Sequence, residues 1–357
     1  MLKRISISIF LGANLCSILL LWLCVALTYI SPEHMPRLSL LTLAFPVFLL
    51  VDIAFIFFWL LFKAKLVWVP IAGLLIIGAH ALDYCPLNLG KDKVIGENND
   101  SSITILTFNV GLMSGEEEQE ELIRFINITH ADIVCLQELS SHFLNNHQAW
   151  LDSTAYHYRQ NGNVAILSTH PFLSDTISIH YPTRSNKSTA CWIECLGDSM
   201  LVVNNHLEST HLSPADKDDY ANAITDPHRQ TIKNSSQMLL GKLSEAASYR
   251  GAQTDSICSL IDRNTAHPVI VCGDHNDTPV SYTYQRLASR LASAYREAGF
   301  GPGFTFSQRF FPVRIDHIFY SKDWQCLSCQ IDRTLTFSDH YPLVARIGKK
   351  NTLSRLY

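Results

Sequence analysis

The sequence predicts an α/β or α+β sandwich domain that follows an apolar, membrane-embedded N-terminal segment. The first 82 of the 357 residues contain only a handful of charges, whereas the remainder has the mixed composition of a globular domain. After residue 102, short β-branched runs alternate with amphipathic stretches, and polar side chains follow many of the apolar runs directly. This alternation favours sheets covered by helices.

Three apolar stretches open the chain, at residues 5–30, 38–62 and 66–82. A hydrocarbon core about 30 Å thick requires roughly 20 apolar helical residues, so we expect about three transmembrane helices and a multi-pass membrane protein. The first stretch is too long for a cleaved signal peptide, and two others follow it at once. Asp52 has no matching charge in the other stretches, which favours a packing role over transport.

The basic residues predict the orientation of these helices. Lys3 and Arg4 precede the first stretch, and Lys63 and Lys65 separate the second from the third. Cytoplasmic loops carry the excess of Lys and Arg, so these ends should be cytoplasmic. An odd number of spans then places the rest of the chain outside, which is the periplasm for a bacterial inner membrane.

We expect three segments: a transmembrane anchor at 1–85, a polar linker at 86–102 and a soluble domain at 103–350. Amphipathic or polar patterns predict helices at 116–129 and within 216–264. The strands expected in the soluble domain are 103–110, 131–139, 163–169, 188–195, 199–207, 267–277, 314–321 and 336–347.

Composition excludes some classes of function. The net charge of -4 argues against a dedicated, sequence-reading nucleic-acid binder, although an enzyme can contact nucleic acid at its active site alone. Cys326 and Cys329 form a CxxC without a second pair, which argues against a structural zinc site. Cys135 and Cys272 lie in apolar runs, where a free cysteine is usually a small buried hydrophobe.

Polar side chains that suit metal and phosphate chemistry follow the apolar runs. Each one alone is typical of a turn or a helix cap. Strand ends cluster at one rim of a sheet, however, and together these residues predict an acidic site for a hard divalent cation, Mg²⁺ above all. Attack of water on a phosphoryl group is the chemistry that such a site supports. The residues are Asn109, Glu138, His206, Asp274, Asn276, Asp316, Asp339 and His340.

The motifs TFN, LQE, NHLES, GDHN, RIDHIF and SDH, in this order across about 230 residues, resemble the endonuclease/exonuclease/phosphatase superfamily. The resemblance covers essentially the whole soluble domain. It implies a four-layer αββα sandwich of the α+β class, with Mg²⁺ or Mn²⁺ at one end. It also implies a metal-dependent hydrolase of phosphate esters.

The resemblance implies a role for each matching residue. Glu138 would be the principal metal ligand, with Asp339 as a second carboxylate on the metal side and Asn109 helping to position metal and phosphate. His206 would hydrogen-bond the phosphate and stabilise the pentacoordinate transition state.

The remaining matches would handle protons and phosphate oxygens. Asp274 would orient or deprotonate the attacking water, and Asn276 would hold a phosphate oxygen. His340, oriented by Asp316, would complete an Asp–His pair that acts as base, acid or phosphate clamp.

The sequence departs from the family pattern at His275, where an apolar or aromatic residue is common, and at His317, where many members have Tyr. We interpret both as substrate-side variation, and we expect His275 and Arg314 to contact the substrate. Arg184 and Lys187 are further basic candidates, for which ordinary solvated charge is an equal alternative.

The leading functional hypothesis is hydrolysis of a phosphodiester in a nuclease-like reaction. A phospholipid or sphingomyelin head group is the alternative that the anchor favours, followed by a phosphatase acting on a soluble ester. A non-enzymatic scaffold would be expected to have lost at least one site residue. The expected partners are therefore a phosphate-ester substrate and the bilayer. Nucleic acid and a lipid head group are the two candidates for the substrate, and no obligate protein partner is inferred.

Overall fold

The computed structural model describes residues 2–89, 102–111, 113, 115–184, 186–210, 229–307 and 312–350. The chain divides into two compact units, which we describe separately. The anchor unit comprises Met1–Tyr84, His211–Gly251 and Thr278–Gln285, and the sheet unit comprises Cys85–Thr210, Ala252–Asp277 and Arg286–Tyr357. The boundaries that the sequence predicts, at 1–85, 86–102 and 103–350, stay predictions.

The N-terminal part of the anchor unit is helical. Its elements are α1 (Leu2–Leu27), α2 (Pro36–Ser39), η1 (Leu40–Ala44), α3 (Phe45–Phe62), η2 (Ala64–Leu66), α4 (Trp68–Ile76) and α5 (Gly78–Tyr84). Two stretches, Ile5–Leu27 and Pro36–Phe62, are long and apolar enough to cross a bilayer. A third crossing results only if Ala64–Ile76 and Gly78–Tyr84, which meet at 70°, form one span.

The predicted third helix, 66–82, is therefore interrupted near its middle. The backbone leaves helical geometry at Ile77, where φ is -101° and ψ is 10°. Gly78 follows, and glycine is among the poorest helix formers because its backbone loses the most entropy on ordering. The helix ends at Ile76 and a new one begins at Gly78.

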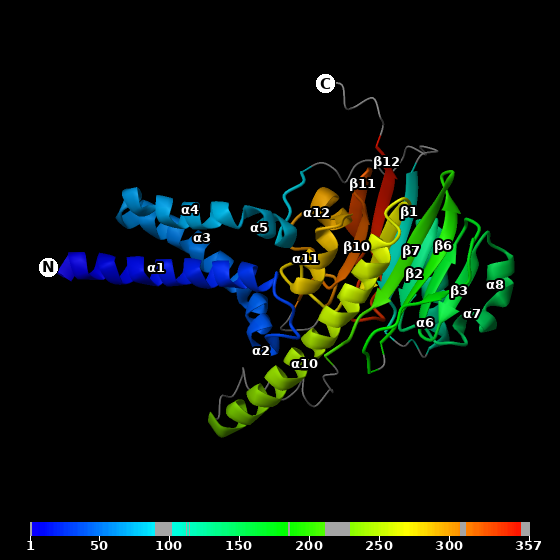
Figure 1. Ribbon diagram of the computed structural model, residues 1–357, viewed down its shortest axis with the longest axis horizontal. Helices are drawn as coiled ribbons and strands as arrows, with labels where there is room; N and C mark the ends of the chain where they lie inside the picture. Colours follow the sequence, from blue (N-terminus) through cyan, green and yellow to red (C-terminus); the bar gives the residue numbers. More distant parts are fainter. Residues whose placement is uncertain are drawn as a thin grey trace. The chain divides into compact units, whose positions relative to one another are not determined.

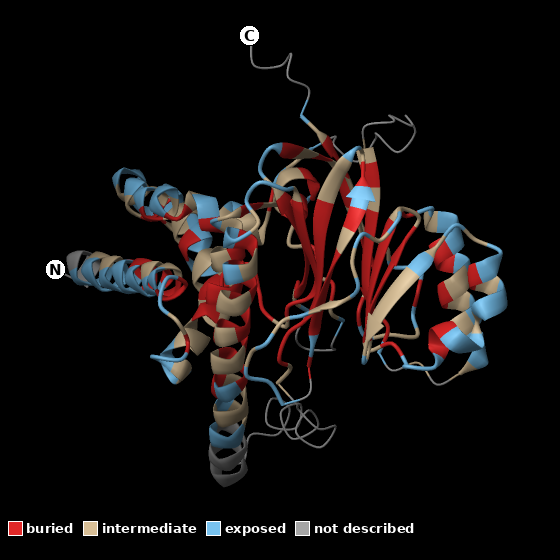
Figure 2. Cartoon of the chain, turned by 45° about the vertical axis from the view of Figure 1, so that its right-hand side comes forward, coloured by how far each residue is buried: buried red, intermediate tan, exposed pale blue. Residues whose placement is uncertain are grey.

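Apolar side chains on the outside of these helices are exposed, as the pale blue surfaces of the helices in Figure 2 show. Leu50 is 65%, Leu61 80% and Leu75 76% exposed. Contiguous apolar exposure on this scale is unfavourable in water and suits a hydrocarbon environment.

The interior of the anchor unit contains a polar contact at Asp52. The Asn14 amide donates to Asp52 Oδ1 at 3.1 Å, and the Trp59 indole donates to Asn14 Oδ1 at 3.0 Å. All three side chains are buried, and they join α1 to α3. This contact agrees with the packing role expected for Asp52.

An apolar cluster in the anchor unit joins segments far apart in sequence. Leu21 and Cys24 of α1, Phe45 of α3 and Ile77 pack together with Val280, and all five are buried. The segment Thr278–Gln285 also donates a hydrogen bond from Gln285 Nε2 to Asp83 Oδ2 at 2.9 Å. Residues downstream of GDHND thus belong to the anchor unit.

The sheet unit contains two six-stranded sheets (Figure 1). The first has the order β11-β12-β1-β2-β4-β3 and the second β5-β6-β7-β8-β10-β9. The strands of the first are β1 (Ser102–Asn109), β2 (Ile133–Gln137), β3 (His157–Asn161), β4 (Val164–Ser168), β11 (Trp324–Ile331) and β12 (Leu343–Lys349). Those of the second are β5 (Ile177–Ser178), β6 (Ser188–Cys195), β7 (Asp198–His206), β8 (Val269–Asp274), β9 (Leu291–Ser293) and β10 (Asp316–Ser321).

The helices outside the N-terminal segment are fewer and mostly short. They are α6 (Glu116–Thr129), α7 (Phe143–Asn146), α8 (Gln148–Asp152), α10 (Arg229–Asp262), α11 (Tyr282–Ala288) and α12 (Ala294–Ala298). The residues before 229 that the sequence also assigns to the long helix, from 216 on, lie outside the described residues.

The two sheets pack face to face, with helices on the outside. Ile105 and Cys135 of the first sheet share one core with Val202 and Ile270 of the second. The alternate residues of β1, such as Phe108, point the other way, into a separate core with α6, α7 and α8. Because both faces of β1 are largely buried, apolar residues occupy both faces and do not alternate strictly with polar ones. The predicted α+β sandwich is confirmed.

The last strand corrects one detail of the sequence interpretation. A strand was expected over 336–347, but β12 begins only at Leu343. Ser338 is held in the preceding loop because its hydroxyl donates to Asn109 O at 2.8 Å and accepts from His340 N at 3.1 Å. Asp339 and His340 therefore lie before a strand rather than at the end of one.

Candidate active site

The topology brings the polar residues to one rim of the two sheets. β1 is parallel to β2 and β7 is parallel to β8, so the carboxyl ends of each pair lie together. β10 is antiparallel to β8, so its first residue, Asp316, pairs with the last residue of β8, Asp274. Asn109 ends β1, Glu138 follows β2, His206 ends β7 and Asp274 ends β8.

Asp274 lies at the centre of the cluster, with 1% of its surface exposed. Its Oδ2 accepts from Asn109 Nδ2 at 3.0 Å and from Asn276 Nδ2 at 3.2 Å, and its Oδ1 accepts from the backbone N–H of Asn276 at 2.8 Å. The Nε2 atoms of His206 and His340 are each 3.8 Å from Oδ2. Burial raises the pKa of Asp274, and the two imidazoles oppose that effect.

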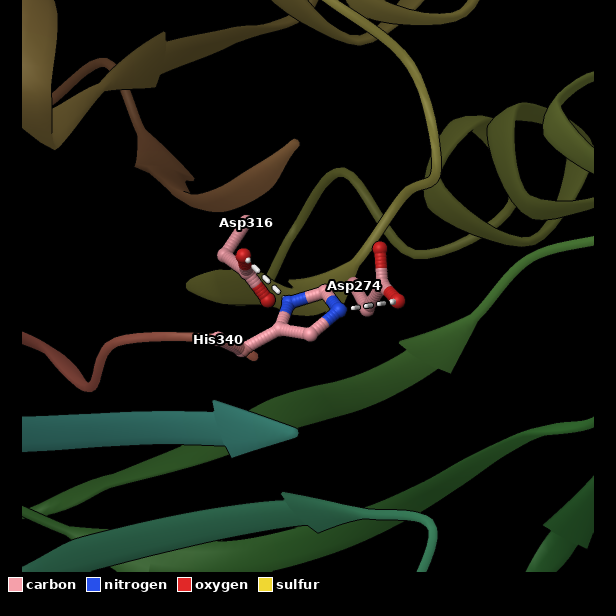
Figure 3. Close-up of side chains that lie close together, drawn as sticks. All are labelled: Asp274, Asp316 and His340. Carbon is pink, nitrogen blue, oxygen red and sulfur yellow. Dashed lines mark hydrogen bonds and ion pairs between the residues drawn. The ribbon is translucent and has the colours of Figure 1, made fainter. Parts of the chain in front are cut away.

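Asp316 and His340 form a buried pair, shown with Asp274 in Figure 3. His340 Nδ1 lies 2.9 Å from Asp316 Oδ2 and, as the only possible donor, carries the hydrogen. Burial alone would lower the pKa of His340, but Asp316 and Asp274 outweigh it and raise the pKa to about 10. His340 is therefore protonated at neutral pH and presents Nε2–H toward Asp274.

Glu138 keeps part of its carboxylate accessible, with 28% of its side chain exposed. Its Oε1 accepts from Asn109 Nδ2 at 3.2 Å and lies 3.6 Å from His206 Nε2. The backbone of Glu138 has φ +57°, and Asn276 has φ +50°. Left-handed backbone at a bulky residue such as Glu is costly and occurs preferentially at functional sites.

Gly273 makes the close approach of β7 and β8 possible. Its φ is +127°, and a Cβ at this position would lie 2.0 Å from the carbonyl oxygen of Asn205. Any side chain here would separate the strands that carry His206 and Asp274.

The structure places the two predicted substrate contacts, His275 and Arg314, in the interior. His275 is fully buried, and Arg314 is 2% exposed with its guanidinium carbon 4.3 Å from the centre of the Tyr295 ring. Arg314 Nη1 also donates to Pro302 O at 2.6 Å. In these positions both side chains contact neighbouring protein groups, and their role as substrate contacts stays a prediction.

The basic alternatives are more accessible. Arg184 and Lys187 are exposed. Lys187 lies beside the site because its carbonyl oxygen accepts from the backbone N–H of His206 at 3.0 Å.

Among the described residues, Asp274, Asp316 and His340 place one potential ligand atom each within 4.8 Å of one another. Glu138 and Asp339, two of the ligands predicted from the sequence, lie outside this group, and their role as ligands stays a prediction. Asp339 is exposed. Asn109 turns its nitrogen toward Glu138 and its oxygen toward Gly111 N, at 3.1 Å, so in this orientation it orients carboxylates.

The donor chemistry nevertheless fits a hard cation. The site gathers the carboxylates of Glu138, Asp274, Asp316 and Asp339, and the charges of Asp316, Asp274 and Asp339 raise the pKa of His340. Clustered carboxylates with an excess of negative charge suit Mg²⁺ or Mn²⁺, and Glu138 and Asp339 offer accessible oxygens.

Sequence reasoning missed the buried residues that support the site. Gln137, Asn204 and Asn205 are fully buried, and Asn204 and Asn205 were interpreted as part of the apolar run before His206. Two consecutive amides inside a strand with both faces buried were the available signal, since buried amides need partners.

Comparison with known proteins adds independent findings. A model of the Endonuclease/Exonuclease/phosphatase family matches residues 106–252 and 259–340. A second model, described as a domain of unknown function, matches residues 7–82. No curated protein matches the chain.

Solved structures similar to this chain share its fold. The human Nocturnin catalytic domain with bound sulfate anion is 19% identical, with a TM-score of 0.50 over 70% of this chain and 95% of that one. D. rerio TDP2, humanized by 14 mutations, is 15% identical, with a TM-score of 0.51 over 70% and 99%. A family protein from Bacteroides thetaiotaomicron is 16% identical, with a TM-score of 0.50 over 70% and 99%.

Proposed function

This chain belongs to the endonuclease/exonuclease/phosphatase family, and on that basis we propose that it is a membrane-anchored, Mg²⁺- or Mn²⁺-dependent phosphodiesterase. The observation that carries the proposal is the buried array of Asp316, His340 and Asp274 beside the accessible carboxylate of Glu138. This arrangement suits attack of water on phosphorus with loss of an alkoxide.

Glu138 is the principal ligand proposed for the cation, with Asp339 as a second carboxylate. When bound, the cation supplies positive charge that stabilises the phosphoryl oxygens. Asn109 donates to Glu138 and Asp274 and so fixes the direction of both carboxylates.

Asp274 is the group proposed to take the proton of the attacking water. Hydrogen bonds from Asn109 and Asn276 hold it as an acceptor in a buried setting, where burial raises its pKa and makes it a stronger base. The new P–O bond then forms as the bond to the leaving oxygen breaks.

His340 and His206 are the proposed donors to the substrate. Protonated His340 offers Nε2–H to a phosphate oxygen or to the leaving oxygen, while Asp316 holds the ring through Nδ1. His206, whose Nε2 faces Glu138 and Asp274, would stabilise charge that develops on the phosphoryl group.

A nuclease-like substrate is our first choice and a lipid head group the second. The exposed apolar helices of the anchor unit favour the second, because they would hold the enzyme at a bilayer. Arg184 and Lys187 provide positive charge for either substrate, since both carry a phosphodiester.

The test uses the full chain in detergent or nanodiscs, because Val280 and its neighbours pack within the anchor unit. Bis(4-nitrophenyl) phosphate, plasmid, single-stranded DNA and sphingomyelin vesicles are assayed with Mg²⁺, Mn²⁺ or EDTA. We expect cation-dependent hydrolysis of the nitrophenyl ester and of DNA. Cleavage of sphingomyelin alone would identify a lipid head group as the substrate. Absence of hydrolysis with either cation would refute the proposal.

Two variants separate the site from the rest of the surface. Glu138→Gln should lower kcat by a factor of about 10² or more, since it removes the charge proposed to hold the cation. Glu194→Gln is the matched control, because Glu194 is exposed on β6. Equal activity of both variants would contradict the site assignment.

We also propose that the sheet unit lies on the extracytoplasmic side of the membrane. The proposal rests on Lys3, Arg4, Lys63 and Lys65 as cytoplasmic residues and on an odd number of crossings. The test is a reporter that functions only in the cytoplasm, fused after Tyr357. Activity of this fusion would overturn the proposal.

A further inference from the structure

Each of three candidate catalytic residues is a direct chain neighbour of a buried polar side chain. Together these side chains form what we call the buried polar frame, and all of them have 0% exposure. Gln137 precedes Glu138, Asn204 and Asn205 precede His206, and His275 follows Asp274; the frame is Gln137, Asn204, Asn205 and His275.

Asn204 connects β7 to the facing sheet. Its Nδ2 donates to Leu136 O at 3.0 Å and to Ala165 O at 2.8 Å, which belong to β2 and β4. Its Oδ1 accepts from Gln137 Nε2 at 2.7 Å. Both amide hydrogens and the oxygen of Asn204 therefore bond to the facing sheet. One of the partners, Gln137, directly precedes Glu138 in the chain.

Asn205 points to the opposite face of β7, because side chains alternate along a strand. Its Nδ2 lies 3.2 Å from His275 Nε2. His275 Nδ1 lies 2.9 Å from Gly273 O, an atom that only accepts, so Nδ1 carries the hydrogen. Burial lowers the pKa of His275 to about 4, so the ring is neutral and its Nε2 accepts from Asn205.

The hydrogen bonds of Asn204 and Asn205 therefore extend from opposite faces of β7 at adjacent residues. Asn204 fixes β7 against β2, next to Glu138, and Asn205 fixes it against the turn after β8, next to Asp274. A buried polar group is costly unless it is hydrogen-bonded, so a shift of β7 that breaks these bonds is strongly disfavoured.

We propose that the buried polar frame is a positioning device that sets the separations among Glu138, His206 and Asp274. The inference rests on the proposed function, because it assigns the frame to the same site. Apolar side chains at these positions could also fill the core, but they would not fix the positions of the three strand ends relative to one another.

A double-mutant cycle in the full chain tests the Asn205–His275 contact. Asn205→Leu and His275→Leu should each lower kcat roughly tenfold, equivalent to about 1.4 kcal/mol, with little change in KM. Each single variant leaves a buried polar partner unpaired, whereas the double variant removes both, so its loss should be smaller than the product of the two.

Two further variants distinguish loss of the hydrogen bond from misfolding. Asn205→Thr suits a strand but lacks the amide donor, and it should reproduce the loss of kcat. His275→Gln keeps one acceptor and one donor, and it should recover part of the activity that His275→Leu loses. Val203→Ala is the matched control, because Val203 is buried on the same face of β7 two residues earlier.

Amide hydrogen exchange gives a readout independent of activity. The N–H of Leu207 donates to Asp274 O at 2.9 Å, and that of Asn276 donates to Asp274 Oδ1 at 2.8 Å. Both amides should exchange faster in Asn205→Leu and in His275→Leu and remain protected in Val203→Ala.

The outcomes distinguish the two proposals. If the wild type hydrolyses no phosphate ester, the proposed function fails, and the exchange of Leu207 and Asn276 still tests the frame. If the frame variants lower only the melting temperature, as expected for Val203→Ala, with kcat and the exchange of both amides unchanged, the positioning role is refuted.

Discussion

Replacing Asp316 by asparagine should lower kcat and move the alkaline limb of the pH profile to lower pH. Asp316 is fully buried and accepts the Nδ1 hydrogen of His340 at 2.9 Å. Asparagine has nearly the same shape, so the substitution removes the negative charge while it leaves the surrounding packing in place.

The magnitude follows from the pKa of His340. Burial alone would lower it, yet Asp316 and Asp274 raise it from 6.5 to about 10. Since each unit corresponds to about 1.4 kcal/mol, the carboxylates hold this proton by several kcal/mol. Asp316 is the closer of the two, because Asp274 Oδ2 lies 3.8 Å from Nε2. Loss of a protonated donor should lower kcat by a factor of about 10² to 10³ at pH 8.

The sign of the pH effect is fixed. With a pKa of about 10 in the folded state, His340 keeps its charge through neutral pH and loses it as pH rises through about 10. Activity of the wild type should therefore persist into alkaline solution, and Asp316→Asn should lose activity at lower pH.

The assay is hydrolysis of bis(4-nitrophenyl) phosphate between pH 5 and 10.5, together with an NMR titration of His340 in EDTA. Asp323→Asn, at an exposed turn, is the control. An unmoved alkaline limb in Asp316→Asn, or a His340 signal that titrates near 6.5 in the wild type, would refute the reasoning.

Three further predictions test other parts of the site. Gly273→Ala should abolish activity and lower the melting temperature sharply, whereas Gly197→Ala, which also has positive φ (+76°) but open space, should cost far less. Mg²⁺ should raise the melting temperature of the wild type, and Glu138→Gln should need at least about tenfold more Mg²⁺ for the same rise; equal titrations would count against Glu138 as a ligand. Because burial lowers the pKa of His275 to about 4, the unfolded state binds more protons between pH 6.5 and 4, so stability should fall by roughly 3 kcal/mol over that range; His275→Leu should flatten this slope in a denaturant series.

The sequence was sufficient for most of the strands and for the residues at the rim. β6 was predicted with its observed bounds, and so was α6, because a long apolar run and a clear helical period each leave little ambiguity. Asn109, Glu138, His206 and Asp274 were identified because polar residues that directly follow apolar runs were expected to cluster at one rim.

The antiparallel strands were harder to interpret. Asp316 begins β10 and His340 precedes β12, so their place at the rim depends on strand direction, which a single sequence does not reveal. The burial of His275 and Arg314 was also beyond reach. A polar residue beside a site motif is equally compatible with a substrate contact and with a supporting role, and the packing of these side chains around Asn205 and Tyr295 leaves no mark in the sequence pattern.

The path of the chain between its two units determines whether a single protease cut can release the sheet unit from the N-terminal helices. The chain passes from one unit to the other at Tyr84–Cys85, Thr210–His211, Gly251–Ala252, Asp277–Thr278 and Gln285–Arg286. Proteolysis after Tyr84 would sever only the first connection, and Val280 would stay packed against Leu21 of the severed part. A single protease cut after Tyr84 is therefore not expected to release the sheet unit from the apolar N-terminal helices.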